Sequence, residues 1–221
     1  MKKLLIVLLI LILLPVALLA YLGVIPGLAK YTARPVDLGI KADKTLVTTF
    51  ENKYGVKDGS GKVKLDVNLS SQEITSVFAV WEDRDVYFPL KNVQVRFNAD
   101  GTGEASGYLK IDTAINLAKN LGYSDADIAQ GKDYIKYVSG DLPFYVKGVG
   151  GMANNKLSIS PSNFQVGRVT VPESITSPLS KVVGDMITRR ISQIGGADIR
   201  DANFKNGSFH LDGTVPDTIK Y

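Results

Sequence analysis

The sequence predicts an α+β protein in which an N-terminal transmembrane helix is followed by a curved antiparallel sheet of hairpins wrapped on a long amphipathic helix. Three observations predict this fold: a long uncharged run at the N-terminus, three hairpin patterns, and one long helical pattern near the C-terminus. The helices are grouped between hairpins, which favours an antiparallel sheet over an alternating parallel one. We expect a transmembrane anchor over 1–29, a linker over 30–41 and one extracytoplasmic domain over 42–221.

The anchor is predicted from the run between Leu4 and Ala29, which contains no charged residue. As a helix it would span about 39 Å, against a hydrocarbon core of about 30 Å. The alternative is a cleaved signal peptide, because Lys2 and Lys3 precede a leucine-rich stretch and Gly27–Ala29 offers a cleavage point. A signal sequence needs only about 7–15 apolar residues, so the length favours an uncleaved anchor. The short tail with two lysines favours a cytoplasmic N-terminus and an extracytoplasmic domain.

The composition excludes several classes of function. The chain has no cysteine among its 221 residues, which removes disulfides, thiol nucleophiles and zinc–thiolate sites. Once Lys2 and Lys3 are assigned to the membrane flank, 24 of the 26 Lys and Arg remain against 22 Asp and Glu. These charges are nearly balanced and scattered along the chain. We therefore expect no nucleic-acid partner.

The first half of the domain alternates helices with strands. Ser70 and Glu73 have the spacing of a capping box, which predicts that a helix begins there. Alternating apolar residues predict strands on both sides of the turn at 99–101. The expected elements are a helix over 42–54, a strand over 62–69, a helix from 70 or 71, and a hairpin over 91–98 and 103–111.

The second half repeats the pattern of helices and hairpins. Ser177 as cap, Pro178 in the first turn and Gly195 after the end predict a helix over 178–194. The Asn206-Gly207 pair is the strongest turn signal, and Pro161 is expected to interrupt its strand or confine it to an edge. The remaining expected elements are helices over 112–121 and 125–138, and hairpins over 144–152 with 157–171 and over 199–204 with 208–215.

No group of residues supports catalysis. The single histidine, His210, falls on the polar side of a predicted strand, so a serine–histidine mechanism is not favoured. Two acidic groups, one of Glu82, Asp83 and Asp85 and one of Asp125 and Asp127, lack the spacing of a calcium loop. Glycine clusters such as the one at 148–151 lie in hairpins rather than at helix N-termini, which favours sheet curvature over phosphate binding. We expect no enzyme activity, no metal and no cofactor.

The C-terminal half resembles the YpmS-like family of bacterial single-pass envelope proteins. The resemblance rests on Leu142-Pro143-Phe144 through Asn155-Lys156-Leu157, on Val166 to Pro172, and on the helix over 179–194. The hairpins over 92–109 and at Asn206-Gly207 are similar to those of LmeA-like phospholipid-binding proteins. The resemblance implies a tubular lipid-binding type of fold and a role with envelope lipids or lipid-linked polymers.

These observations lead to one functional hypothesis and one alternative. We expect a cell-membrane protein that binds acyl chains in an apolar groove, with the membrane, a phospholipid or a lipid-linked polymer as partner. If the same apolar residues fill a closed core, the protein is instead a non-enzymatic envelope scaffold or assembly partner. The expected lipid-binding residues are Leu179, Val183, Met186, Ile187 and Ile191 of the long helix, with Val93, Val95, Phe97 and Phe209 of the sheet.

Overall fold

The computed structural model describes residues 34–54, 61–126, 128 and 141–216, together with 14, 15, 17 and 18. Its helices are α3 (Lys44–Tyr54), α4 (Ser71–Arg84), α5 (Ile111–Asn120) and α7 (Glu173–Gln193). Its strands are β1 (Lys62–Leu69), β2 (Leu90–Phe97), β3 (Gly103–Lys110), β4 (Asp141–Ala153), β5 (Lys156–Val166), β6 (Val169–Thr170), β7 (Asp198–Lys205) and β8 (Ser208–Pro216).

Two predicted elements fall mainly outside these residues. They are the transmembrane anchor over 1–29 and the helix over 125–138. Within the described part of the chain, no helix combines the length and the apolar character needed to cross a membrane.

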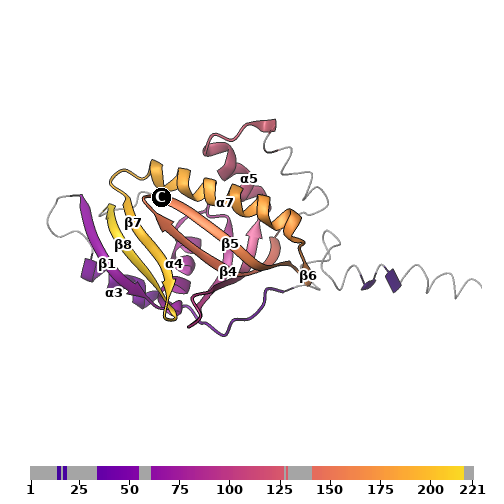
Figure 1. The fold of residues 1–221 in the computed structure, drawn as a ribbon, viewed down its shortest axis with the longest axis horizontal. Coiled ribbons are helices and arrows are strands. Elements are labelled where there is room, and N and C mark those ends of the chain that lie inside the picture. Colours follow the sequence, from indigo (N-terminus) through magenta and orange to yellow (C-terminus); the bar gives the residue numbers. More distant parts are fainter. Residues whose placement is uncertain are drawn as a thin grey trace, which may run out of the picture.

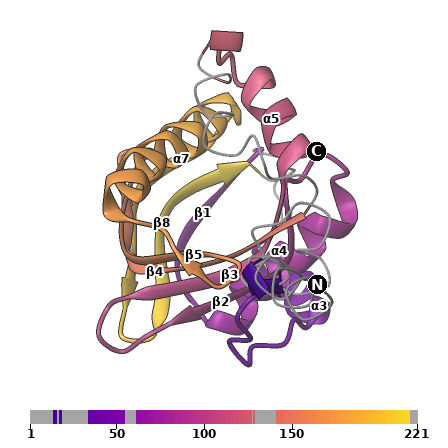
Figure 2. The same cartoon turned by 90° about the vertical axis from the view of Figure 1, so that its right-hand side faces the viewer.

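The eight strands form one antiparallel sheet that curls into a half-barrel (Figures 1 and 2). The long strand β4 is its branch point. On one side it pairs with β5, and on the other it pairs first with β3 through residues 141–148 and then with β7 through residues 151–153. Two arms therefore leave β4, one made of β3 and β2, the other of β7, β8 and β1. The predicted α+β class and curved antiparallel sheet are confirmed.

One face of the sheet is apolar across β1, β8, β7 and β4. Residues paired directly across an antiparallel ladder share a face, and the register aligns Val67 with Leu211, Leu211 with Ala202, and Ala202 with Met152. Helices α3 and α4 cover the β1 end of this face, where Phe50 and Ile74 pack on the buried strand residues. The core therefore lies inside the curl.

The hairpin of β2 and β3 and the hairpin of β7 and β8 contact each other near their turns, through three aromatic rings. Phe97 of β2 lies 5.2 Å from Phe204 of β7 and 5.9 Å from Phe209 of β8, measured between ring centroids. Gly103 allows this approach, because a Cβ on it would stand 2.7 Å from the Phe204 ring. The predicted turn at Asn206-Gly207 is confirmed, with positive φ at both residues.

Helix α4 covers the outer edge of β2. The Thr75 hydroxyl accepts a hydrogen bond from the Val95 N–H at 2.9 Å and donates to the Val95 carbonyl at 3.3 Å. The Ser71 hydroxyl accepts from the Phe97 N–H at 2.9 Å. The predicted capping box of Ser70 and Glu73 starts this helix. Side-chain hydroxyls thus satisfy backbone groups that an edge strand leaves unpaired.

Helix α7 differs from its prediction in both start and surroundings. It begins at Glu173 with Pro172 as cap, so Pro178 lies inside it instead of opening it. The sheet does not enclose the helix. Instead, α7 lies along β5 (Figure 1), with Thr188 accepting a hydrogen bond from the Leu157 N–H at 3.2 Å. The close approach requires small residues: a Cβ on Gly184 would stand 3.3 Å from the Leu157 carbonyl oxygen.

The strand predicted over 157–171 is wrong in its C-terminal part. It ends at Val166, because Gly167 adopts a φ of +62° and turns the chain into β6. Pro161 pairs with Gly148 of β4, at the point where the register of the two strands shifts. Among the described strands it pairs only with β4, in agreement with the prediction that Pro161 confines its strand to an edge.

The segment before α3 is attached to the domain rather than free. Leu38 is only 5% exposed, and its N–H donates to the Gln94 Oε1 at 2.8 Å. The Lys41 carbonyl accepts a hydrogen bond from Gln72 of α4 at 3.1 Å. The linker predicted over 30–41 therefore belongs in part to the folded domain. We call residues 34–43 the strap.

Candidate functional site

The four sheet residues predicted to bind lipid come together, but in a packed core. Val93, Val95 and Phe97 are 6–8% exposed and form one cluster. Phe209 packs on this cluster, as do Ile74 and Phe78 of α4. The protein's own side chains therefore occupy this part of the predicted groove.

The five α7 residues are placed differently. Ile191 packs against the cluster of Met152, Ile199 and Ala202, which Phe209 also contacts. Leu179, Val183, Met186 and Ile187 do not belong to a core cluster of the described residues. Val183 is 44% exposed and Ile187 39%, and the neighbouring Val182 is 46% exposed.

This exposure follows from how α7 rests on the sheet. The buried residues of the helix are Thr176 and Gly184, which are small or polar. Because α7 contacts β5 through that side, Val182, Val183 and Ile187 are left largely uncovered. A side of a helix this apolar normally faces a core or a partner.

A crevice of about 710 Å³, lined by both polar and apolar side chains, lies between the edge of β5 and α7. Serine and threonine hydroxyls line much of it, and the buried Oδ1 of Asn163 has no hydrogen-bond partner among the described residues. Its polar lining includes Ser158, Ser160, Ser162, Thr176, Ser177, Ser180, Lys181, Asp185 and Thr188. The crevice is not among the features predicted from the sequence, although the serines at every second position of the strand were its signal.

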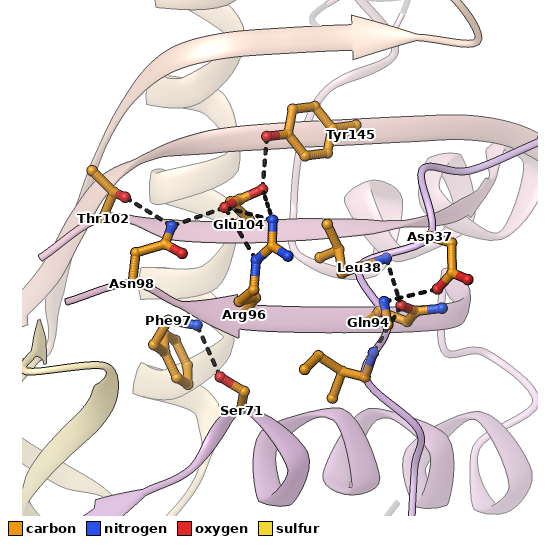
Figure 3. A network of polar contacts seen from close by, with 12 residues as sticks. Asp37, Leu38, Ser71, Gln94, Arg96, Phe97, Asn98, Thr102, Glu104 and Tyr145 are labelled. Carbon is orange, nitrogen blue, oxygen red and sulfur yellow. Dashed lines mark hydrogen bonds and ion pairs between the residues drawn. The ribbon is translucent and has the colours of Figure 1, made fainter. Parts of the chain in front are cut away.

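A polar network lies on the face of the sheet opposite the apolar core (Figure 3). The Glu104 carboxylate accepts hydrogen bonds from Arg96 Nη2 at 2.9 and 3.0 Å, from Asn98 at 2.9 Å and from the Tyr145 hydroxyl at 2.8 Å. Burial by itself would raise the pKa of Glu104, but the hydrogen bonds from Arg96, Asn98 and Tyr145 outweigh it and lower the pKa. Burial, followed by the bond to Glu104, raises the pKa of Tyr145 to about 12. The network joins β2, β3 and β4.

The predicted polar position of His210 is observed. It pairs across the sheet with Asn68 and Asn203, on the side opposite the core residues Phe209 and Leu211. Over the described ranges, no three histidine, aspartate or glutamate side chains gather in a way that could hold a metal ion.

Comparisons with known proteins identify no relative. No protein-family model matches the chain, and neither the curated proteins nor the solved structures contain a match.

Proposed function

We propose that this protein is a membrane-anchored, extracytoplasmic module of the cell envelope that binds lipid acyl chains. The observation that carries the proposal is the uncovered apolar side of α7, where Val182, Val183 and Ile187 are 39–46% exposed. The proposed ligand surface consists of Leu179, Val183, Met186, Ile187 and Ile191. Phe209 and the other sheet residues form the packed base beside Ile191.

The chemistry of this surface suits a hydrocarbon chain. Leu179, Val183, Ile187 and Ile191 follow one another at intervals of four residues, so they form a stripe about 18 Å long on one side of the helix. Each buried CH₂ of a ligand would contribute about 0.8 kcal/mol. A linear apolar stripe without a polar partner inside it offers no hydrogen bond to a polar ligand, and it therefore favours an acyl chain.

The cellular setting is proposed from the sequence. The uncharged run from Leu4 to Ala29 is long enough for a transmembrane anchor, and the two-lysine tail favours a domain outside the cytoplasm. The resemblance to YpmS-like and LmeA-like proteins is consistent with lipids as ligands. An anchored domain remains close to its proposed ligands at all times.

Photocrosslinking of the full-length chain in lipid vesicles tests the proposal. The vesicles contain a phospholipid with a diazirine in its acyl chain, and crosslinked peptides are identified by mass spectrometry. We expect crosslinks on α7 around Val183 and Ile187, because carbene insertion requires contact with the acyl chain. The double substitution Val183→Asp and Ile187→Asp should abolish them by adding buried charge to the complex.

Val149→Asp is the matched control, because Val149 is also exposed, at 51%, but belongs to β4 and not to α7. It should leave the crosslinks unchanged. Crosslinks confined to the segment before residue 34 would contradict lipid binding by the domain.

The alternative is an envelope scaffold whose apolar core is closed. The tight packing of Val93, Val95 and Phe97 favours it. A domain without lipid crosslinks on α7 would support this alternative.

A further inference from the structure

The loop that follows α4 exposes two consecutive apolar residues. Val86 is 78% exposed and Tyr87 69%, which makes them the most exposed of the large hydrophobic side chains in the described residues. Isolated apolar residues are common on protein surfaces. Two adjacent ones on a projecting turn are more typical of a contact surface.

The turn holds these side chains in an outward position. Asp85 anchors it, since its Oδ1 accepts a hydrogen bond from the Tyr87 N–H at 2.8 Å and its carbonyl accepts one from the Phe88 N–H at 3.0 Å. The Phe88 ring points inward and lies 5.8 Å from Trp81 and 6.0 Å from Phe78. Phe88 therefore fixes the loop to α4, while Val86 and Tyr87 project from it.

The loop lies at one defined end of the sheet. Leu90 pairs with Leu109 and Lys110 pairs with Asp141, so the start of β2, the end of β3 and the start of β4 are neighbours. The turn between β5 and β6 is at the same end, because the Gly167 N–H donates to the Pro143 carbonyl at 2.8 Å.

The strap brings the N-terminal side of the chain to this same end. Leu38 of the strap hydrogen-bonds to Gln94 in the middle of β2. Lys41 hydrogen-bonds to Gln72 of α4, and the neighbouring Ser71 of that helix hydrogen-bonds to Phe97 at the far end of β2. Residue 34 is therefore directed toward the start of β2. Figure 1 shows the strap reaching the end of the molecule where β6 lies.

The tether between the anchor and this end is short. Five residue steps separate Ala29, the last residue of the uncharged run, from Arg34. A fully extended chain covers at most about 18 Å over that distance. If the run spans the membrane, the end of the domain that carries Arg34 must face the bilayer at close range.

We propose that the loop over 85–89 docks on the bilayer surface, with Val86 and Tyr87 inserted at the level of the lipid headgroups. This inference rests on the proposed anchor but not on lipid binding by α7. Tyrosine suits the interface because its ring is apolar and its hydroxyl can remain hydrated. Docking would give the domain a second membrane contact and a fixed orientation.

The single tryptophan of the chain reports on this contact. Trp81 packs on Phe88 at the base of the loop, and the sequence contains no other tryptophan. The full-length protein is reconstituted into vesicles of phosphatidylcholine and phosphatidylglycerol, with and without a nitroxide on the lipid headgroup, and membrane insertion is checked by flotation. We expect the nitroxide lipid to quench Trp81 fluorescence, because a nitroxide quenches only at short range and the docked loop lies at the level of the headgroups that carry it.

The loop variant and its control separate docking from other causes. Val86→Asp combined with Tyr87→Ser should lower the quenching by about threefold or more, because it removes the apolar contact. Val149→Asp adds the same charge at an exposed valine outside the loop and should leave the quenching unchanged. Circular dichroism confirms that both variants are folded.

Each result has a defined meaning. A protein that floats with the vesicles but shows no quenching would overturn the docking inference and leave the anchor intact, as would equal quenching in the loop variant. A protein that does not float would overturn the anchor and the inference together. Acyl-chain crosslinking on α7 reports separately on lipid binding.

Discussion

Glu104 is a buried carboxylate on the polar face of the sheet, with 7% of its side chain exposed. A charge in that position is tolerated when donors surround it. Arg96 and Asn98 supply them from β2 and the residue after it, and Tyr145 supplies one from β4. The sequence offered no sign of this network, because Tyr145 lies 41 positions from Glu104 and only the register brings them together.

Substituting this carboxylate should change both the stability and its pH dependence. Glu104→Gln should lower the unfolding free energy at neutral pH by about 1–3 kcal/mol, because charged hydrogen bonds become neutral ones. The folded-state pKa of Glu104 is lowered, so its contribution is complete above the unfolded-state value of about 4.3 and is lost as the pH falls through the lower folded value. Urea unfolding between neutral pH and acid should therefore show a shallower acid decline for the variant.

Glu51→Gln is the control for that substitution. Glu51 pairs with Arg84 on the surface, where its side chain is 47% exposed. Exposed pairs contribute at most about 1 kcal/mol. An equal loss of stability in both variants would contradict a special role for the buried network.

At the element scale, two helices protect two of the outer edges of the branched sheet, those of β2 and β5. Helix α4 places hydroxyls against β2, and α7 places Thr188 against β5. The capping box at Ser70 predicted α4, and the amphipathic pattern over 178–194 predicted α7 and its apolar side. The pattern did not predict that α7 turns Gly184 toward the sheet, because this glycine has no special signal until the Leu157 carbonyl is brought beside it.

Removing the Thr75 hydroxyl should weaken the contact between α4 and β2. Thr75→Val keeps the shape but leaves the Val95 N–H without its partner in a buried position. We expect a loss of about 1–3 kcal/mol in unfolding free energy and faster hydrogen exchange at the Val95 amide. Thr49→Val, at an exposed residue of α3, should have little effect. Unchanged exchange at Val95 would show that another group protects this edge.

At the scale of the whole molecule, the two arms of the sheet diverge from β4 and meet again through Phe97, Phe204 and Phe209. Long-range pairing dominates this arrangement, since β1 near the start of the domain pairs with β8 at its end. The aromatic contact therefore joins parts of the chain that no local signal connects.

A double-mutant cycle measures the coupling between the arms. Phe97→Ala and Phe204→Ala should each destabilise the fold by about 3–5 kcal/mol, with a coupling of about 0.5–1.5 kcal/mol between them. Leu142→Ala lies at the far end of β4 and should combine additively with Phe204→Ala. Additive losses for the two phenylalanines would show that the arms are stabilised independently.

The sequence by itself determined the local elements: the capping box at Ser70, the turn at Asn206-Gly207, and the alternation that separates apolar from polar faces. These signals depend on residues close in the chain, whose preferences act before any tertiary contact forms. Only the tertiary structure decided what covers each apolar face. It buried Val93, Val95 and Phe97 under α4 and left Val183 and Ile187 exposed, because periodicity defines an apolar side but not the surface that it meets.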